Sequence, residues 1–210
     1  MIDSITFITP YVYVGGQTAA RALSNIYLNG IRCIINVARE LPHVQYPSHI
    51  ESIKINIDDV STYHIEKYFD KIADKIHQNE TIVKRKTLVH CQAGMSRSVT
   101  CVIAYLMKYK QMSLIQAYNY VKYKRQIAKP NYGFWKQLQT YERKLIKQNN
   151  QTITNKFQAI IYTIKTKLNK IFYVQDDHRY RIQKIVYIPA RSMFYPFIKE
   201  SIYYILTIYF

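Results

Sequence analysis

Short apolar runs recur along the first two thirds of the chain, and their spacing switches between the period of a strand and that of a helix. Four of these runs predict strands: residues 11–14, 31–37, 53–57 and 87–90. In the third run Ile53, Ile55 and Ile57 alternate with polar residues, as in a half-buried strand. The second run is nearly continuous in β-branched residues, which favours a buried strand.

Helical patterns lie between and after these runs. The predicted helices cover residues 18–28, 65–77, about 98–109, 114–127 and 134–147. Ile65, Phe69 and Ile72 fall on one helical face, and Ser113 is a suitable N-cap for the helix that follows it. Strands that alternate with helices predict an α/β fold, with a central, mainly parallel sheet flanked by helices.

The polar stretch KQNNQT at residues 147–152 marks the predicted boundary between a domain, residues 1–148, and a basic, Ile- and Tyr-rich extension, residues 149–210. Apolar residues at helical spacing predict an amphipathic helix in the extension: Ile160, Ile161, Ile164, Leu168 and Ile171. The uncharged residues 202–210 are too few to span a bilayer. These features predict attachment to an anionic membrane surface or to a protein partner. Packing of the extension back on the domain and partial disorder are the alternatives.

Charge narrows the choice of partners. The chain has 30 Lys and Arg against 13 Asp and Glu, a formal net charge of +17. Such a protein favours anionic partners, namely phosphoproteins, acidic membrane surfaces or nucleic acid. Three cysteines give no disulfide framework. The sequence lacks a signal-peptide pattern and a membrane-spanning run, so an intracellular location in the cytoplasm or the nucleus is expected.

The segment from His90 to Ser98, HCQAGMSRS, carries the candidate chemistry. It lies between a predicted strand and a predicted helix, where backbone N–H groups and the helix dipole form a cradle for an anion. Cys91 begins the loop in a positive field that favours the nucleophilic thiolate. Arg97 ends the loop with a planar fork that matches phosphate. Gly94 permits the tight turn, Ser98 is placed to stabilise the sulfur, and His90 to orient the loop.

This segment resembles the signature loop of the protein tyrosine phosphatase superfamily, in its dual-specificity branch. Other stretches match the same branch: residues 8–10 (ITP), 13–15 (YVG), 30–38 (GIRCIINVA), 104–107 (AYLM) and 130–134 (PNYGF). The resemblance covers about residues 5–147 and leaves the extension unexplained. It implies a protein phosphatase that hydrolyses phosphotyrosine and phosphoserine or phosphothreonine through a phosphocysteine. It also implies a phosphate-binding loop made by Gln92, Ala93, Gly94, Met95, Ser96 and Arg97, with Asn131 in support.

The resemblance further implies a general acid on a separate loop. Asp59 is selected because it follows the pattern of Ile55 and Ile57, and Asp58 is the alternative. An aspartic acid there would protonate the leaving oxygen and then deprotonate the attacking water.

The neutral middle of the loop resembles protein phosphatases more than the phosphoinositide phosphatases or RNA 5′-phosphatases of the superfamily. Those two activities are the enzymatic alternatives, and a non-catalytic phosphate-binding module is the third reading. No cluster of Cys, His or Asp has metal-ligand spacing, so neither a metal nor another cofactor is expected.

Overall fold

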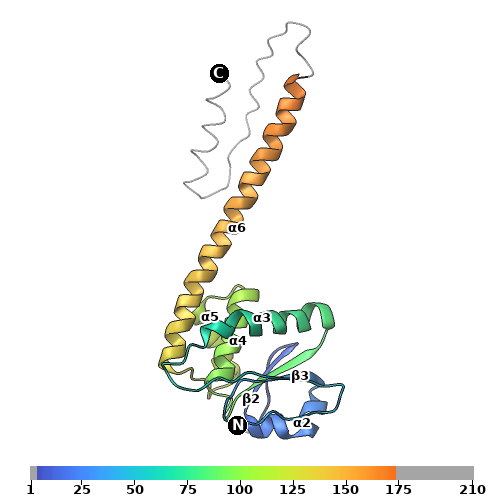
Figure 1. The fold of residues 1–210 in the computed structure, drawn as a ribbon, viewed down its shortest axis with the longest axis vertical. Helices are drawn as coiled ribbons and strands as arrows, with labels where there is room; N and C mark the ends of the chain where they lie inside the picture. The colour runs from blue at the N-terminus through green and yellow to red at the C-terminus, as the bar shows by residue number, and fades with distance from the viewer. Residues whose placement is uncertain (1–3, 174–210) are drawn as a thin grey trace. The chain divides into compact units, whose positions relative to one another are not determined.

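A five-stranded sheet forms the centre of the protein, whose computed structural model describes residues 4–173 (Figure 1). The strands are β1 (Thr6–Thr9), β2 (Val12–Gly15), β3 (Ile31–Asn36), β4 (Glu51–Lys54) and β5 (Lys86–His90). Their order across the sheet is β1-β2-β5-β3-β4, and only the β1–β2 pair is antiparallel. The predicted α/β fold with a mainly parallel sheet is therefore confirmed.

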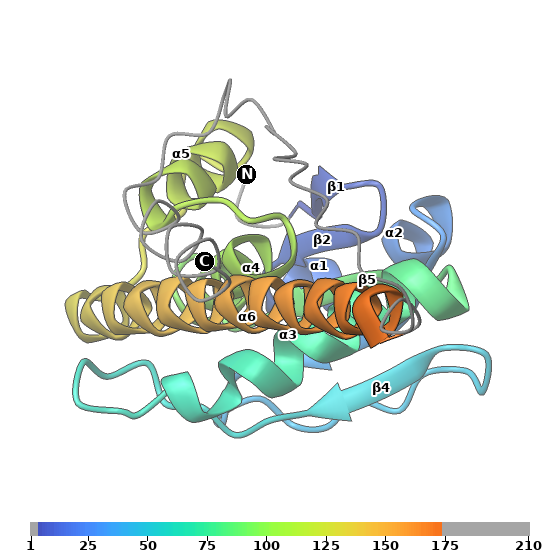
Figure 2. The same cartoon turned by 90° about the horizontal axis from the view of Figure 1, so that it is seen from above.

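Helices cover both faces of this sheet (Figures 1 and 2). One face carries α1 (Gln17–Arg21) and α2 (Leu23–Leu28). The other carries α3 (Phe69–Gln78), which follows the 3₁₀ turn Glu66–Tyr68 and leads into the π-helical turn Asn79–Val83, together with α4 (Arg97–Tyr109), α5 (Leu114–Lys124) and the first part of α6 (Tyr132–Tyr173). A capping box on Ser113 starts α5, as its side chain predicts.

Alternation along the strands divides the core into two layers. In β5, Leu88 packs with the cluster under α1 and α2, and Val89 packs with the larger cluster under α3 to α6. Ile34 and Ile35 divide in the same way on β3.

The central strands β2, β5 and β3 are parallel, so their carboxyl ends lie at the same edge of the sheet. The loop after β5 begins at this edge.

Several of the predicted elements have different bounds in the structure. The helix predicted at residues 18–28 is divided at Ala22, whose extended backbone separates α1 from α2. The strand predicted at 53–57 lies two to three residues earlier in the structure, as β4. It ends at Lys54 because its partner β3 ends at Asn36, which pairs with Lys54. The helix predicted at 114–127 ends at Lys124, and the chain then turns back toward the loop after β5.

The helix predicted to end at residue 147 continues as α6 to Tyr173. The stretch KQNNQT lies inside this helix, because it contains neither Gly nor Pro and polar side chains are compatible with a solvated helix. The chain divides into two compact units, Met1–Ala159 and Ile160–Phe210. Within residues 4–173 no helix is both long and apolar enough to cross a membrane. Residues 202–210, Leu168 and Ile171 lie outside the residues whose side chains are described.

Candidate active site

The signature loop joins the end of β5 to the start of α4. Cys91 follows the strand and is 1% exposed, and Arg97 is the first residue of the helix. Gly94 has a φ of +66°, and a Cβ built on it would lie 2.4 Å from the carbonyl oxygen of Gly15. The loop therefore requires glycine at this position, both for its left-handed backbone and for its close approach to β2.

The carbonyl oxygens of the loop point outward. Four consecutive ones accept hydrogen bonds from neighbouring segments: Gln92 from Gln17 N (2.8 Å), Ala93 from Arg125 Nη2 (3.1 Å), Gly94 from Arg125 Nε (2.6 Å) and Met95 from Lys129 N (2.9 Å). In a trans peptide the N–H points away from the preceding carbonyl, and none of the described peptide bonds is cis. The N–H groups of the next four residues therefore point to the inner side, where they form a nest for an anion.

Arg125, just after α5, donates two of these hydrogen bonds to the loop, and sequence reasoning missed this residue. Its side chain also donates to Ser4 O and to Thr6 Oγ1, so it joins the loop to the start of β1. Arg125 is 3% exposed and has no carboxylate partner within residues 4–173. Burial lowers its pKa. The loop therefore packs against a buried cation, and this positive charge favours binding of an anion by the loop.

Two groups flank the sulfur of Cys91. Ser98 Oγ lies 3.3 Å from Cys91 Sγ, within reach of the hydrogen bond expected for it. His90 Nδ1 lies 3.4 Å from the carbonyl oxygen of Cys91. Burial lowers the pKa of His90 to about 4, so the imidazole is neutral near pH 7 and serves as a hydrogen-bonding group.

The other two cysteines, Cys33 and Cys101, are buried in the core. Burial raises the pKa of both thiols, that of Cys33 to about 11.

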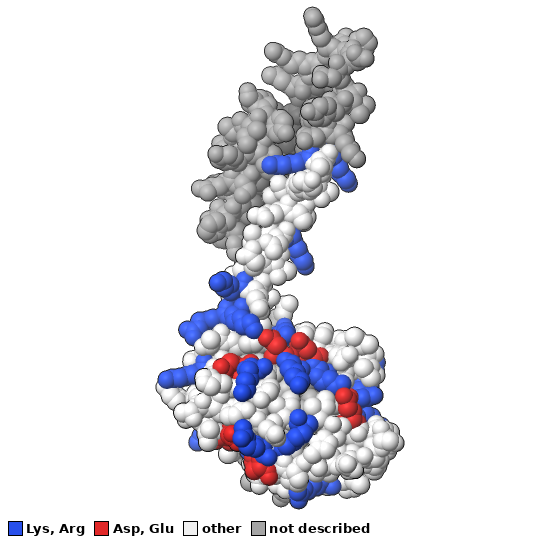
Figure 3. Space-filling model, viewed as in Figure 1, with Lys and Arg blue, Asp and Glu red and all other residues white. Residues whose placement is uncertain are grey.

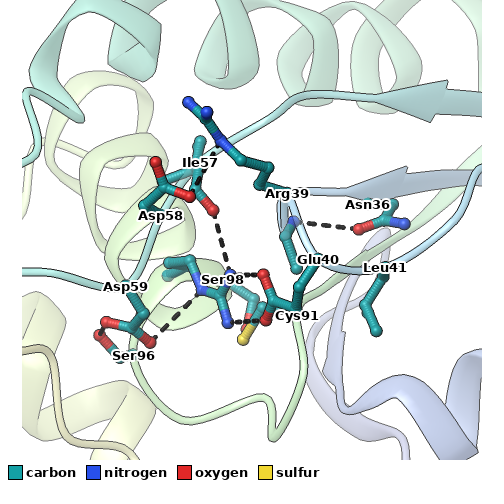
Figure 4. Close-up of polar contacts among 12 residues, drawn as sticks. Asn36, Arg39, Glu40, Leu41, Ile57, Asp58, Asp59, Cys91, Ser96 and Ser98 are labelled. Atoms are coloured by element: carbon teal, nitrogen blue, oxygen red, sulfur yellow. Dashed lines mark hydrogen bonds and ion pairs between the residues drawn. The ribbon is translucent and has the colours of Figure 1, made fainter.

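Glu40 and Ile57, which lie on two other loops, hold the side chain of Arg97. Figure 4 shows where Glu40 and Ile57 lie beside the signature loop. Arg97 Nη1 donates to Glu40 Oε2 (2.6 Å) and to Ile57 O (3.0 Å), and Arg97 Nη2 donates to Glu40 Oε1 (2.5 Å). The guanidinium keeps the pKa of the Glu40 carboxyl below its usual range. Nε is buried without a hydrogen-bond partner among residues 4–173, although Asp59 Oδ2 lies 3.3 Å away as an ion pair. Sequence reasoning missed Glu40, because no sequence motif around this residue marks it.

Asp59 and Asp58 differ sharply in their surroundings. Asp59 Oδ1 accepts hydrogen bonds from Ser96 Oγ (2.7 Å) and Asn131 Nδ2 (2.8 Å), which places its carboxylate against the signature loop. Asp58 instead pairs with Arg39 at 2.9 Å. Of the two candidates, only Asp59 contacts the loop that holds Cys91 and Arg97.

The loop, its inward N–H groups and the carboxylate beside it make a site for a phosphate monoester. Within residues 4–173 no group of His, Cys, Asp and Glu is suited to hold a metal ion. The sequence model described as "Dual specificity phosphatase, catalytic domain" matches residues 12–144. The chain belongs to this family.

Curated relatives and solved structures agree with this assignment. Human dual specificity protein phosphatase 14 is 44% identical over 147 residues, 69% of this chain and 72% of that protein. Human dual specificity protein phosphatase 21 is 39% identical over 156 residues, 73% and 80% of the two chains. The crystal structure of human DUSP28 is 30% identical, with a TM-score of 0.63, and the match covers 67% of this chain and 94% of that one.

A mouse putative dual specificity phosphatase, complexed with zinc tungstate, has a TM-score of 0.66 at 29% identity, and the match covers 70% of this chain and 91% of that one. The protein is therefore a dual specificity protein phosphatase, a phosphoric monoester hydrolase whose substrates are phosphoproteins. The resemblance stated from the signature loop is confirmed for the family, the fold and the class of reaction.

Proposed function

We propose that Cys91, Arg97 and Asp59 carry out the hydrolysis through a phosphocysteine intermediate. The observation that supports this most strongly is the Nε–Nη2 edge of Arg97. Nε–H and the second hydrogen of Nη2 lie on this edge of the guanidinium, and neither has a hydrogen-bond partner within residues 4–173, while Asp59 Oδ2 lies 3.3 Å from Nε. This edge binds two oxygens of a phosphate at once, and Cys91 lies at the start of the same loop.

In the first step the Cys91 thiolate attacks phosphorus and the bond to the leaving oxygen breaks. Asp59, in its acid form, gives that oxygen a proton, so a tyrosine, serine or threonine hydroxyl departs and the phosphoryl group stays on sulfur. The inward N–H groups of the loop and the Nε–Nη2 edge of Arg97 stabilise the charge on the phosphoryl oxygens.

In the second step a water attacks the same phosphorus and the sulfur–phosphorus bond breaks. Asp59, now a carboxylate, takes the proton of this water, and inorganic phosphate leaves. Ser98 donates to the departing sulfur and stabilises it as a thiolate. Cys91 and Asp59 then return to their starting forms, so the cycle needs neither a metal nor a cofactor.

A substrate panel tests this proposal. Phosphotyrosine and phosphothreonine peptides should both be hydrolysed, whereas 5′-triphosphorylated RNA and phosphoinositides should be poor substrates. Cys91→Ser should lose turnover and still bind phosphopeptide, because a serine hydroxyl stays protonated where a thiol ionises. Turnover of Cys91→Ser above about a tenth of the wild-type rate would contradict covalent catalysis at this residue.

We also propose that the extension attaches the enzyme to an anionic membrane surface. The charged residues of 143–167 are all basic, and Figure 3 shows only basic charged side chains along the described helix beyond the domain. Four apolar side chains at helical spacing are about half exposed: Ile153, Phe157, Ile160 and Ile164. A basic helix with an exposed apolar stripe is suited to the surface of an anionic bilayer. Of the predicted stripe, Ile161 is only partly exposed.

Vesicle binding tests the second proposal. Exchange of Lys156, Lys165 and Lys167 for Gln in the full chain should weaken binding to vesicles that contain phosphatidylserine and leave peptide hydrolysis unchanged. A matched variant with Lys67, Lys71 and Lys84 exchanged for Gln controls for net charge. Equal loss in both variants would contradict a membrane site on α6, and attachment of the wild type to a protein but not to vesicles would favour a protein partner.

A further inference from the structure

Asp59 lies in the middle of a loop that has no regular secondary structure of its own. This acid loop, residues 56–63, lies between β4 and the 3₁₀ turn before α3, and its residues form neither helix nor strand. Ordering the backbone of such a segment costs conformational entropy. Contacts that hold the loop in one conformation therefore decide how often Asp59 meets the signature loop.

The side chain of Tyr63 closes the acid loop at its base. Its hydroxyl donates to the carbonyl oxygen of Asn56 (2.6 Å), so the first and last residues of the loop are joined. Tyr63 N donates to Val60 O (3.0 Å), which closes a turn in the second half of the loop. The ring packs against the core, and Lys67 Nζ lies 5.2 Å from its centroid. Packing and hydrogen bonding therefore fix the orientation of this tyrosine.

Helix α6 holds the second half of the same loop. Gln137 Nε2 donates to Tyr63 O (2.8 Å), and Gln137 Oε1 accepts from Glu66 N (3.1 Å), so one amide joins the loop and the turn after it to the helix. A Cβ built on Gly133 would lie 1.7 Å from Ser61 O, which shows how closely the loop backbone approaches α6. The first turns of α6 therefore fix this part of the loop.

We propose that Tyr63 and Gln137 are positioning residues for the phosphatase reaction. The proposal rests on the proposed role of Asp59 as the general acid. Tyr63 and Gln137 hold the acid loop in the conformation in which Asp59 contacts Ser96 and Asn131. When the loop leaves this conformation, the carboxyl group is too far away to give its proton to the leaving oxygen. The rate of proton transfer therefore scales with the fraction of molecules in which the loop is held in place.

The contacts of Asp59 itself are a weaker restraint. The Asp59 side chain is 32% exposed, so water competes for its oxygens. It also gives up and takes back a proton in each cycle, so its hydrogen bonds change during the reaction. Tyr63 and Gln137 bind only backbone groups of the loop and of the turn after it. Their contacts do not depend on the protonation of Asp59 and hold the loop through both steps.

Tyr63→Phe tests the first contact, because it removes one hydroxyl and keeps the packed ring. We expect kcat/KM for a phosphothreonine peptide to fall roughly 2- to 10-fold, the range of one hydrogen bond. For an aryl phosphate whose leaving group needs no proton, kcat/KM should change less than about twofold, because proton transfer contributes little to its departure. Tyr123→Phe on α5, whose side chain is 85% exposed, is the matched control and should behave as wild type.

Gln137→Met tests the second contact, because it removes both amide hydrogen bonds at similar side-chain length. It should lower kcat/KM for the phosphothreonine peptide at least as much as Tyr63→Phe, and again spare the aryl phosphate. Hydrogen exchange gives a readout besides activity: the amide of Glu66 should exchange faster than in the wild type, and the signature loop should be unchanged. Gln139→Met, at an exposed position of the same helix, is the matched control.

An equal fall for both esters would overturn the proposal, because it would show a general effect on the fold or on phosphate binding. Wild-type kcat/KM for both esters in both variants would overturn it too. If Gln137→Met folds poorly, Tyr63→Phe decides alone. Asp59→Asn separates this failure from that of the proposed function. If only Asp59→Asn slows the phosphothreonine peptide, the positioning roles fail and the general acid stands. If Asp59→Asn keeps wild-type kcat/KM, the proposed role of Asp59 fails with them.

Discussion

Asn131 Nδ2 lies 2.8 Å from Asp59 Oδ1, so the residue that caps α6 also holds the proposed general acid. The other atom of the same amide, Oδ1, accepts from Phe134 N (3.0 Å) at the start of the helix. Because the cap fixes the orientation of the amide, its nitrogen is left facing Asp59. The start of α6 is therefore tied to the catalytic geometry.

Asn131→Ser tests the cap of α6 and the contact with Asp59 separately. Serine caps a helix about as well as asparagine, but its side chain offers no donor that reaches Asp59. The melting temperature should stay near that of the wild type, while kcat should fall more for alkyl phosphate esters than for esters whose leaving group needs no proton. An equal fall for both kinds of ester would contradict a role through Asp59.

Asp59→Asn should slow formation of the phosphocysteine by roughly 10²- to 10⁴-fold with phenolic or alkyl esters. An asparagine can keep the contacts with Ser96 and Arg97 only in part, and it has no proton to give. Asp58→Asn is the matched control, since Asp58 pairs with Arg39 and makes no contact with the signature loop. Single-turnover kinetics check both variants. The opposite ranking would place the acid at Asp58.

Arg125→Met should lower both stability and activity. The carbonyl oxygens of Ala93 and Gly94 would lose their donors, and a buried acceptor without a partner costs about 1–3 kcal/mol. The free energy of unfolding measured in urea and kcat/KM should both fall. Lys124→Met, on the neighbouring residue, removes a cation that lies over the ring of Phe7 and should leave kcat/KM unchanged. Full activity in Arg125→Met would exclude a supporting role for this guanidinium.

Stability should depend on pH through His90. Burial lowers the pKa of His90 from 6.5 to about 4, so the unfolded chain takes up a proton at a higher pH than the folded chain does. The free energy of unfolding should therefore fall as pH drops from about 6.5 toward 4, by on the order of 3 kcal/mol in all. Above about pH 6.5 the effect should be absent.

Urea unfolding between about pH 7 and 5 measures this dependence. The slope should be smaller in His90→Asn, whose amide does not titrate in this range, than in the wild type. Equal slopes for His90→Asn and the wild type would show that the buried imidazole is not the source.

The sequence was sufficient for the parts of the site that lie on one continuous segment. The spacing from His90 to Ser98 located the loop, and the strand before it and the helix after it are where the pattern predicts them. The pattern of alternating strands and helices likewise predicted the α/β fold. Local residue patterns carry this information because turn, strand and helix are local properties of the chain.

The missed residues act over long sequence separations. Glu40 and Arg125 reach the loop from other segments, and nothing in their immediate neighbours marks them. The choice between Asp59 and Asp58 turned on family alignment alone, whereas the structure separates them by their contacts. The length of α6 was mispredicted because a polar stretch without Gly or Pro was interpreted as a break.

The most direct test of the account is to trap the enzyme during turnover. Wild-type protein mixed rapidly with a phosphotyrosine peptide and quenched in acid should carry one phosphate on the sulfur of Cys91, identified by mass spectrometry of the peptide that contains this residue. Asp59→Asn should accumulate it more slowly, and Cys91→Ser should carry none. Phosphate on any other residue, or turnover without a phosphorylated enzyme under conditions where hydrolysis of the intermediate limits the rate, would contradict the proposed mechanism.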